Sequence, residues 1–301
     1  MFRKAERKRA KLRLAICGVS GSGKTYTSLK IAKGIGGKIA MIDTEHGSGE
    51  LYSDIEGIPE YDVVQLSAPF SPERYIQIIK EAEKQGYTTL IIDSLSHAWA
   101  GNGGVLDIVD KATKASRTNN SFAAWQDATP HQNKLIDTIL RSNLHIICTM
   151  RSKSAYETVE QNGKKKIIKV GLEPIQRQGV DYEFTVVLDL SVDGHVAGIS
   201  KDRTGLFDGK HFIADEDTGV KLLEWLNTGE DIYSECDSFI NKIKSCGNME
   251  NLISIFDEIK KSKIFTDEGL REKVIAEKDL KKIELQSIND GGYNNATQTA
   301  A

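Results

Sequence analysis

The sequence has few of the residues that stabilise small secreted proteins or build membrane spans. Its 301 residues include four cysteines and five prolines, and the cysteines do not have the spacing of metal ligands. Cys17 and Cys148 lie in apolar runs, so we expect buried thiols and a reduced, cytoplasmic setting. No apolar run approaches the about 20 residues that a membrane helix needs, and the N-terminus lacks an apolar signal core. The sequence therefore does not favour a disulfide-stabilised secreted domain, and no membrane partner is expected.

An excess of positive charge is also absent. The 40 Lys and Arg residues are balanced by 43 Asp and Glu residues, which gives a formal net charge of -3. Binding to nucleic acid would therefore have to come from local basic patches. One such patch is residues 2–13, with Arg3, Lys4, Arg7, Lys8, Arg9, Lys11 and Arg13 against Glu6. Hydrophobic residues make up 39% and charged residues 28% of the chain, which is typical of a globular protein.

Up to residue 150, short apolar runs alternate with segments of helical periodicity. The expected strands are 12–17, 38–43, 62–66, 88–94 and 144–150, and the expected helices are 25–35, 72–84 and 121–140. Strands that alternate with helices favour a mostly parallel central sheet covered by helices on both faces, an α/β fold.

The pattern changes after residue 150. Residues 155–170 are rich in lysine around Gly163 and predict a hairpin or a mobile loop. Residues 182–192 and 195–201 predict a hairpin that adds antiparallel strands to the sheet. The expected division of the chain is a basic N-terminal segment (1–11), a large α/β domain (12–229), a small helical domain (230–285) and a disordered tail (286–301).

Residues 18–25 read G-V-S-G-S-G-K-T, a full match to the phosphate-loop pattern between an apolar strand and a helix. The glycines let successive backbone N–H groups point at phosphates, and the start of the helix adds partial positive charge. Lys24 is expected to reach the β- and γ-phosphates of ATP, and the Thr25 hydroxyl to bind Mg²⁺. The expected nucleotide-binding residues are Gly18, Ser20, Gly21, Ser22, Gly23, Lys24, Thr25 and Tyr26.

An apolar strand that ends in an acid provides the second part of a nucleotide site. The run L-I-I-D ends at Asp93, and an aspartate at this place in a P-loop fold holds Mg²⁺, usually through water. Ser94 is a possible helper. The alternative is an aspartate that caps the following helix.

A second strand ends in Asp43-Thr44-Glu45-His46. The segment MIDTEHGSGELY resembles the part of RecA-type recombinases in which a strand ends in Asp-x-Glu-His, and LIIDSLSHAW resembles their second nucleotide motif. The resemblance implies that Glu45 positions and activates the water that attacks the γ-phosphate. Asp43 and Glu50 are neighbouring candidates for the same role, and a surface loop residue is the alternative.

The same resemblance implies a γ-phosphate sensor after strand 144–150, where Thr149 and Arg151 stand in place of the Asn-Gln of RecA recombinases. The run S-K-D-R-T-G at 200–205 resembles the trans-acting Lys-x-Arg pair of DnaB-type helicases. It implies that Lys201 and Arg203 complete the ATP site of a neighbouring copy in a homo-oligomer. The alternative is a solvated turn with two exposed cations.

Taken with SFAAW, TMRSK and SKDRTGLFDG, these motifs resemble RecA-like ATPases of bacteriophages, often described as phage AAA-family ATPases, some of which are single-strand annealing recombinases. The resemblance covers about residues 10–215 and implies single-stranded DNA held by loops 101–120 and 152–178. The second region contains Lys153, Tyr156, Lys164, Lys165, Lys166, Lys169 and Arg177. A solvated surface is the alternative for each basic segment.

The leading hypothesis is therefore an oligomeric, DNA-stimulated ATPase of phage recombination or replication, located in the host cytoplasm if phage-encoded. A DnaB-type translocating motor and a nucleotide-gated interaction module without turnover remain as alternatives. The helical domain after residue 230 either binds a protein partner or is a packing appendage.

Overall fold

The structure is a computed structural model that describes the backbone of residues 7–116, 120–161 and 164–296, and side chains in these ranges apart from 155–170 and 288–296. The chain divides into two compact units, residues 11–226 and residues 1–10 with 227–301. Within the described residues, no helix is long and apolar enough to cross a membrane.

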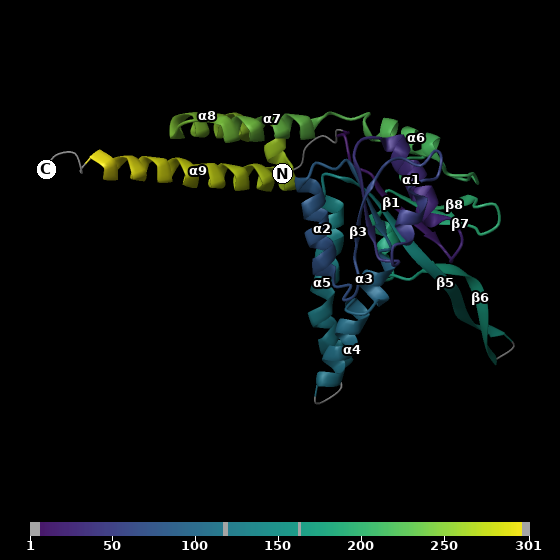
Figure 1. Ribbon diagram of the computed structural model, residues 1–301. Helices are drawn as coiled ribbons and strands as arrows, with labels where there is room; N and C mark the ends of the chain where they lie inside the picture. The colour runs from purple at the N-terminus through teal and green to yellow at the C-terminus, as the bar shows by residue number, and fades with distance from the viewer. Residues whose placement is uncertain (1–6, 117–119, 162–163, 297–301) are drawn as a thin grey trace. The chain divides into compact units, whose positions relative to one another are not determined.

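The larger unit is built on one sheet with the strand order β3-β2-β4-β5-β1-β7-β8, to which β6 is added by pairing with β5 (Figure 1). The strands are β1 (Arg13–Gly18), β2 (Ile39–Asp43), β3 (Asp62–Gln65), β4 (Thr89–Asp93), β5 (His145–Gln161), β6 (Lys164–Pro174), β7 (Val186–Leu190) and β8 (Ala197–Asp202). The central pairs are parallel, whereas β8 runs antiparallel to β7 and β6 antiparallel to β5. This confirms the expected α/β fold with antiparallel strands added after residue 180.

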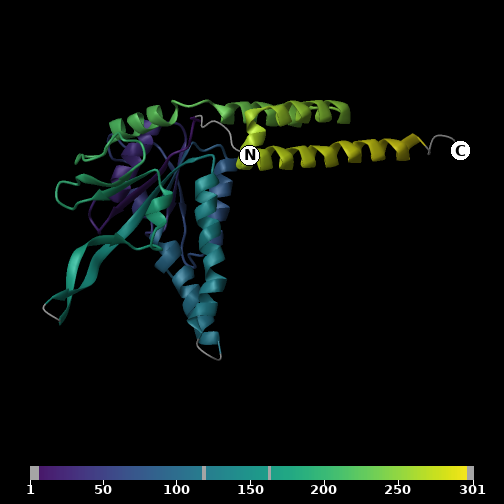
Figure 2. The same cartoon turned by 180° about the vertical axis from the view of Figure 1, so that it is seen from behind.

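Alternate side chains of the central strands point to opposite faces of the sheet, as the pleat requires. Ala15 and Cys17 belong to a core cluster under α2 and α5, whereas Leu14 and Ile16 belong to a second cluster under α1 and α6. Helices thus cover both faces (Figure 2). The helical elements of this unit are α1 (Lys24–Ile35), η1 (Ser48–Tyr52), α2 (Pro72–Lys84), α3 (Ser96–Ala100), α4 (Val105–Ala115), α5 (Ser121–Arg141), η2 (Val180–Glu183) and α6 (Glu216–Leu226).

Helices α1 and α6 approach each other closely through two glycines. A Cβ on Gly34 would lie 1.9 Å from the backbone oxygen of Glu216, and a Cβ on Gly219 would lie 2.1 Å from the backbone oxygen of Ile31. Any side chain at either position would force the helices apart. The two glycines, which have no side chain, therefore allow the close approach of α1 and α6 on this face of the sheet.

The region 101–120 does not form the loop expected from the sequence. Residues 105–115 form α4, in which Val105 and Val109 lie one turn apart and pack on Ala124 and Ala128 of α5. Burial of this apolar stripe stabilises the helix and makes α4 and α5 a helical pair. The region 152–178 contains a β-hairpin, the first of the two alternatives expected for residues 155–170, because β5 continues past the sheet and pairs with β6.

The smaller unit consists of α7 (Ile232–Ser245), α8 (Met249–Lys261), η3 (Lys263–Thr266) and α9 (Glu268–Ala296) around an apolar core of its own. Basic residues of the N-terminal segment pair with acids of this unit: Lys8 with Asp267 at 3.1 Å and Arg9 with Asp231 at 2.5 Å. The backbone of α9 continues past the expected boundary at residue 285, because elongation of an existing helix costs little. Residues 297–301 of the expected disordered tail lie outside the described residues.

Candidate nucleotide-binding site

The phosphate loop joins the end of β1 at Gly18 to the start of α1 at Lys24. Gly21 and Gly23 have φ angles of 77° and 87°, a left-handed conformation that glycine adopts without strain and that curls the loop. Among the described residues, no side chain caps the N-terminus of α1, and its first turn contains no acid. The free N–H groups and the helix dipole therefore provide an anion site that no carboxylate of the first turn opposes.

Lys24 lies across its own loop. Its Nζ donates a hydrogen bond of 2.9 Å to the backbone oxygen of Val19. Burial lowers the pKa of the Lys24 ammonium, and the carboxylates of Asp93 and Glu45 act against that shift. A partly desolvated ammonium that is bonded only to a neutral carbonyl forms a stronger, charge-assisted hydrogen bond when a phosphate is added. Lys24 therefore fits the expected phosphate contact.

Asp93 stands at the centre of the site and is 2% exposed. The hydroxyls of Thr25 and Thr149 each donate to one of its carboxyl oxygens at 2.5 Å. Burial raises the pKa of this carboxyl, while the two threonine hydrogen bonds lower it and burial remains the larger effect.

The Thr25 hydroxyl and the Asp93 carboxyl lie side by side next to the anion site of the phosphate loop. Both offer hard oxygen ligands, which Mg²⁺ takes together with the phosphate oxygens of a nucleotide. The residues therefore fit Mg²⁺. When bound, the ion would neutralise charge on the β- and γ-phosphates. Ser94, the possible helper, is fully buried, and its hydroxyl has no hydrogen-bond partner among the described residues.

Glu45 follows β2 on the same edge of the sheet, since Asp43 at the end of β2 pairs with Asp93 at the end of β4. The two oxygens of the Asp43 carboxyl accept the N–H groups of Glu45 at 2.6 Å and Gly49 at 3.1 Å. Asp43 is 1% exposed, and both of its carboxyl oxygens hold the loop that follows β2.

The third candidate, Glu50, accepts a hydrogen bond of 3.3 Å from Gln65. Glu45, in contrast, is partly exposed, and its carboxylate pairs with Arg151 at 2.9 Å. Of the three acids, the geometry favours Glu45 for contact with a water near the phosphates.

The remaining loop residues differ in their surroundings. The Ser22 hydroxyl is buried, without a hydrogen-bond partner among the described residues, and it would lie 2.3 Å from a Cβ at Gly18. Ser20 is exposed. Tyr26 is 38% exposed, and its ring centroid lies 6.3 Å from that of Tyr52.

With this geometry established, similarity to known proteins can be stated. A family model described as "AAA domain" matches residues 10–217. The chain belongs to this AAA-domain family. No curated protein matches the sequence significantly. Among solved structures, the crystal structure of the RadB recombinase is similar at 16% identity, over 64% of this chain and 83% of that one, with a TM-score of 0.36. The α/β fold that the sequence predicted, a mostly parallel sheet with antiparallel strands and flanking helices, is confirmed.

The AAA domain does not bring Lys201 and Arg203 into its own phosphate site. Lys201 lies at the end of β8, the edge strand two places from β1 in the sheet, and Arg203 directly follows that strand. Lys201 Nζ donates to the backbone oxygens of Asp181, at 3.1 Å, and Tyr182, and an Arg203 guanidinium N–H donates to the same Tyr182 oxygen at 2.7 Å. The two cations therefore converge on η2.

Two contacts at the site were missed from the sequence. Thr44 accepts the Ser94 N–H at 2.7 Å and lies 2.6 Å from His97 Nδ1, which fixes the segment after Asp93. His195, in the β7–β8 turn, lies against the phosphate loop, because its Nδ1 would be 3.2 Å from a Cβ on Gly23. Thr44 lies inside the Asp-x-Glu-His motif, so the motif could have indicated its place at the site. The sequence around His195 contains no motif that indicates a contact with the phosphate loop.

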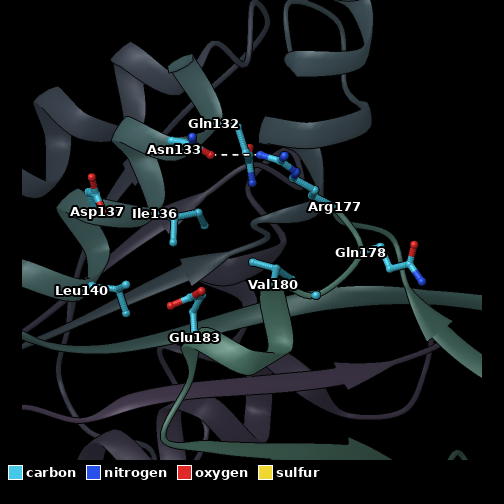
Figure 3. A pocket seen from close by; sticks show the side chains of 10 residues that line it. Gln132, Asn133, Ile136, Asp137, Leu140, Arg177, Gln178, Val180 and Glu183 are labelled. Atoms are coloured by element: carbon cyan, nitrogen blue, oxygen red, sulfur yellow. Dashed lines mark hydrogen bonds between the residues drawn. The ribbon is translucent and has the colours of Figure 1, made fainter. Parts of the chain in front are cut away.

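A cavity of about 410 Å³ lies between α5 and η2, apart from the nucleotide residues (Figure 3). Its lining is mostly polar, and Arg177 donates to Asn133 Oδ1 at 2.9 Å across it. Gln132 of this lining bonds Gln176, and Gln176 bonds the backbone oxygen of Leu95. The hydrogen bonds thus connect α5 to the segment that follows Asp93.

Proposed function

We propose that this protein binds Mg-ATP and hydrolyses it to ADP and phosphate. The observation that carries the proposal is the shared sheet edge, where the Thr25–Asp93 pair lies beside the phosphate loop and Glu45 follows the neighbouring strand. In the proposed mechanism, Lys24 and the loop N–H groups bind the phosphates, and Thr25 and Asp93 hold Mg²⁺. Glu45 takes a proton from the attacking water, and Thr149 keeps Asp93 oriented.

The test is phosphate release by the full chain in Mg-ATP, measured beside Lys24→Ala. Turnover by the natural sequence that is lost in Lys24→Ala supports the proposal. ATP binding without turnover would favour instead a nucleotide-gated interaction module.

The second part of the proposal is a homo-oligomer whose ATP sites lie at subunit boundaries. Lys201 and Arg203 of one copy would stabilise the charge that develops on the γ-phosphate of the next, a role in which an arginine contributes about 10³–10⁵ in rate. Mixing Arg203→Ala with Lys24→Ala subunits is the test. Each variant lacks activity alone, and the mixture recovers part of it, because some boundaries combine an intact phosphate loop with an intact finger. A mixture no more active than its components argues against shared sites.

The third part is stimulation by single-stranded DNA bound along the β5–β6 hairpin. The hairpin offers lysines for contact with phosphates and a tyrosine for stacking on bases. These residues, whose side chains lie outside the described part of the chain, are Lys164, Lys165, Lys166, Lys169 and Tyr156. Replacing Lys164 to Lys166 with alanine should weaken binding to an oligo-dT and reduce the slope of log K against log salt by up to about 0.7 per lost phosphate contact. An unchanged salt slope would remove these lysines from the binding surface.

We propose phage recombination or replication as the biological setting, in the cytoplasm of the host. The Lys201–Arg203 pair also favours a second candidate, a DnaB-type translocating motor. Strand unwinding separates the two, because a motor unwinds duplex DNA and a recombinase does not. The smaller unit is proposed to bind a protein partner.

A further inference from the structure

The cavity between α5 and η2 has no part in the proposed reaction (Figure 3). Its volume of about 410 Å³ lies in the range of pockets that hold small ligands or single side chains. One wall is a face of α5, from which Gln132, Ile136 and Leu140 project at a spacing of one helical turn. The opposite wall is the segment 177–183, so both walls belong to the larger unit.

Gln132 places an unsatisfied acceptor in the wall of this cavity. Its side chain is 1% exposed, its Nε2 donates to Gln176 Oε1 at 3.0 Å, and its Oε1 has no hydrogen-bond partner in the described part of the chain. The amide cannot be turned round, because Gln176 Oε1 is an acceptor that also takes the N–H of Arg177 at 2.7 Å. A buried oxygen without a donor is costly, so a ligand that brings an N–H into the cavity is favoured.

Two carboxylates of the lining are also without partners. Asp137 and Glu183 are exposed, and neither forms a hydrogen bond or an ion pair with another described residue. Figure 3 shows both of them apart from the hydrogen bond that Arg177 donates to the neutral Asn133 Oδ1. The lining thus has two negative charges against one positive charge, which disfavours a phosphate or a nucleic acid and favours a cation.

Apolar side chains line the same cavity. Ile136, Leu140 and Val180 offer an aliphatic surface next to these polar groups. Lysine and arginine pack their methylene stems on such a surface while the charged head group keeps polar partners. A basic residue in a peptide therefore matches the lining, since it combines an aliphatic stem, a cation and a neutral main-chain N–H.

We propose that this cavity binds a lysine or arginine residue of a partner peptide. The head group would lie between Asp137 and Glu183, and a main-chain N–H would donate to Gln132 Oε1. A residue within a peptide fits better than a free amino acid, because a neutral N–H is not repelled by the Arg177 guanidinium, whereas an α-ammonium group is.

The test is calorimetric titration of the full chain with acetyl-L-arginine methylamide, which mimics an arginine within a peptide. Its citrulline analogue has the same shape without the charge. The arginine compound should bind saturably, with a Kd of about 1 mM, as expected for a ligand of this size. Exposed ion pairs contribute a factor of about two to five each. Asp137→Asn and Glu183→Gln should therefore each weaken its binding about two- to fivefold, and the citrulline compound should bind about four- to 25-fold more weakly.

Asp127→Asn is the matched control, because Asp127 is an exposed acid of α5 that does not line the cavity. Its loss should leave the affinity unchanged. Gln132→Leu, with its folding checked by thermal unfolding, should weaken binding about two- to tenfold. Asp137→Asn and Glu183→Gln change exposed side chains and decide the question even if Gln132→Leu does not fold.

Three results would overturn the inference. Absence of saturable binding removes the site. Equal binding of the arginine and citrulline compounds, or an equal loss of affinity in Asp127→Asn, removes the role of Asp137 and Glu183. Tighter binding of free L-arginine than of the blocked compound removes the peptide as the occupant.

Discussion

Removal of the Thr149 hydroxyl gives the sharpest test of how the site is held together. In Thr149→Val the side chain keeps its shape but loses the 2.5 Å hydrogen bond to Asp93 Oδ1, in a place where Thr149 is fully buried. A hydrogen bond to a charged acceptor contributes about 1.5–3 kcal/mol. For a unit of the size of residues 11–226, that corresponds to a melting temperature lower by about 3–12 °C.

Thr89→Val is the matched control, because Thr89 is on the same sheet, is equally buried, and its hydroxyl has no hydrogen-bond partner among the described residues. Removing an unsatisfied hydroxyl should leave the melting temperature unchanged or raise it. Thermal unfolding without nucleotide, at neutral pH, compares the two variants. Equal melting temperatures would refute the idea that the Thr149–Asp93 bond stabilises the fold.

The same variant makes a prediction about pH. Burial raises the pKa of Asp93 above the ordinary 3.8, and the Thr149 hydrogen bond lowers it, so Thr149→Val raises it further. Mg²⁺ binding needs the ionised carboxyl, hence the acidic limb of the ATPase pH profile should move to higher pH. The hydrogen bond favours the charged form, so the stability lost in Thr149→Val should be largest above the folded-state pKa and shrink as the pH falls through it. An acidic limb that stays in place would contradict the role given to Asp93.

Three further predictions follow from single contacts. Lys24→Ala should lose the rise in melting temperature that Mg-ATP gives, since the loss of binding removes the linked stabilisation; an undiminished rise would contradict its role. Glu45→Gln should bind Mg-ATP but turn it over about 10²–10⁴-fold more slowly in single-turnover assays, and a normal rate would move the base elsewhere. Gly34→Ala should lower stability by about 1–3 kcal/mol in thermal unfolding, because its Cβ meets the Glu216 oxygen, whereas Gly247→Ala, with open space around it, should not.

The parts predicted well from the sequence are those with a short-range signal. The apolar run before Gly18 and the run ending at Asp93 are buried strands, as expected, because an interior parallel strand is apolar on both faces. The parallel register then brings the strand ends to one edge, which is why Asp93 lies beside the phosphate loop.

The parts that the sequence did not predict depend on contacts between distant segments. The resemblance predicts a loop where Val105 and Val109 form a helical stripe, because the helical character of this segment depends on burial against α5. The Arg151–Glu45 pair joins residues separated by 106 positions, so no local pattern contains it. The sequence predicts a separate N-terminal segment, whereas Lys8 and Arg9 pair with acids more than 200 residues away.

The present contacts of Lys201 and Arg203 are compatible with a role at a neighbour's phosphate. Both donate to the neutral carbonyl oxygen of Tyr182, and burial, followed by the repulsion of Arg203, lowers the pKa of Lys201. Two cations that share one neutral acceptor repel each other, and charge-assisted bonds to an anion are about twice as strong as bonds between neutral groups. A γ-phosphate presented by another subunit would relieve that repulsion and replace the carbonyl as the better acceptor. Under the proposed oligomer, the pair held on η2 would be a resting arrangement from which both side chains gain by leaving, and a solvated turn offers no such gain.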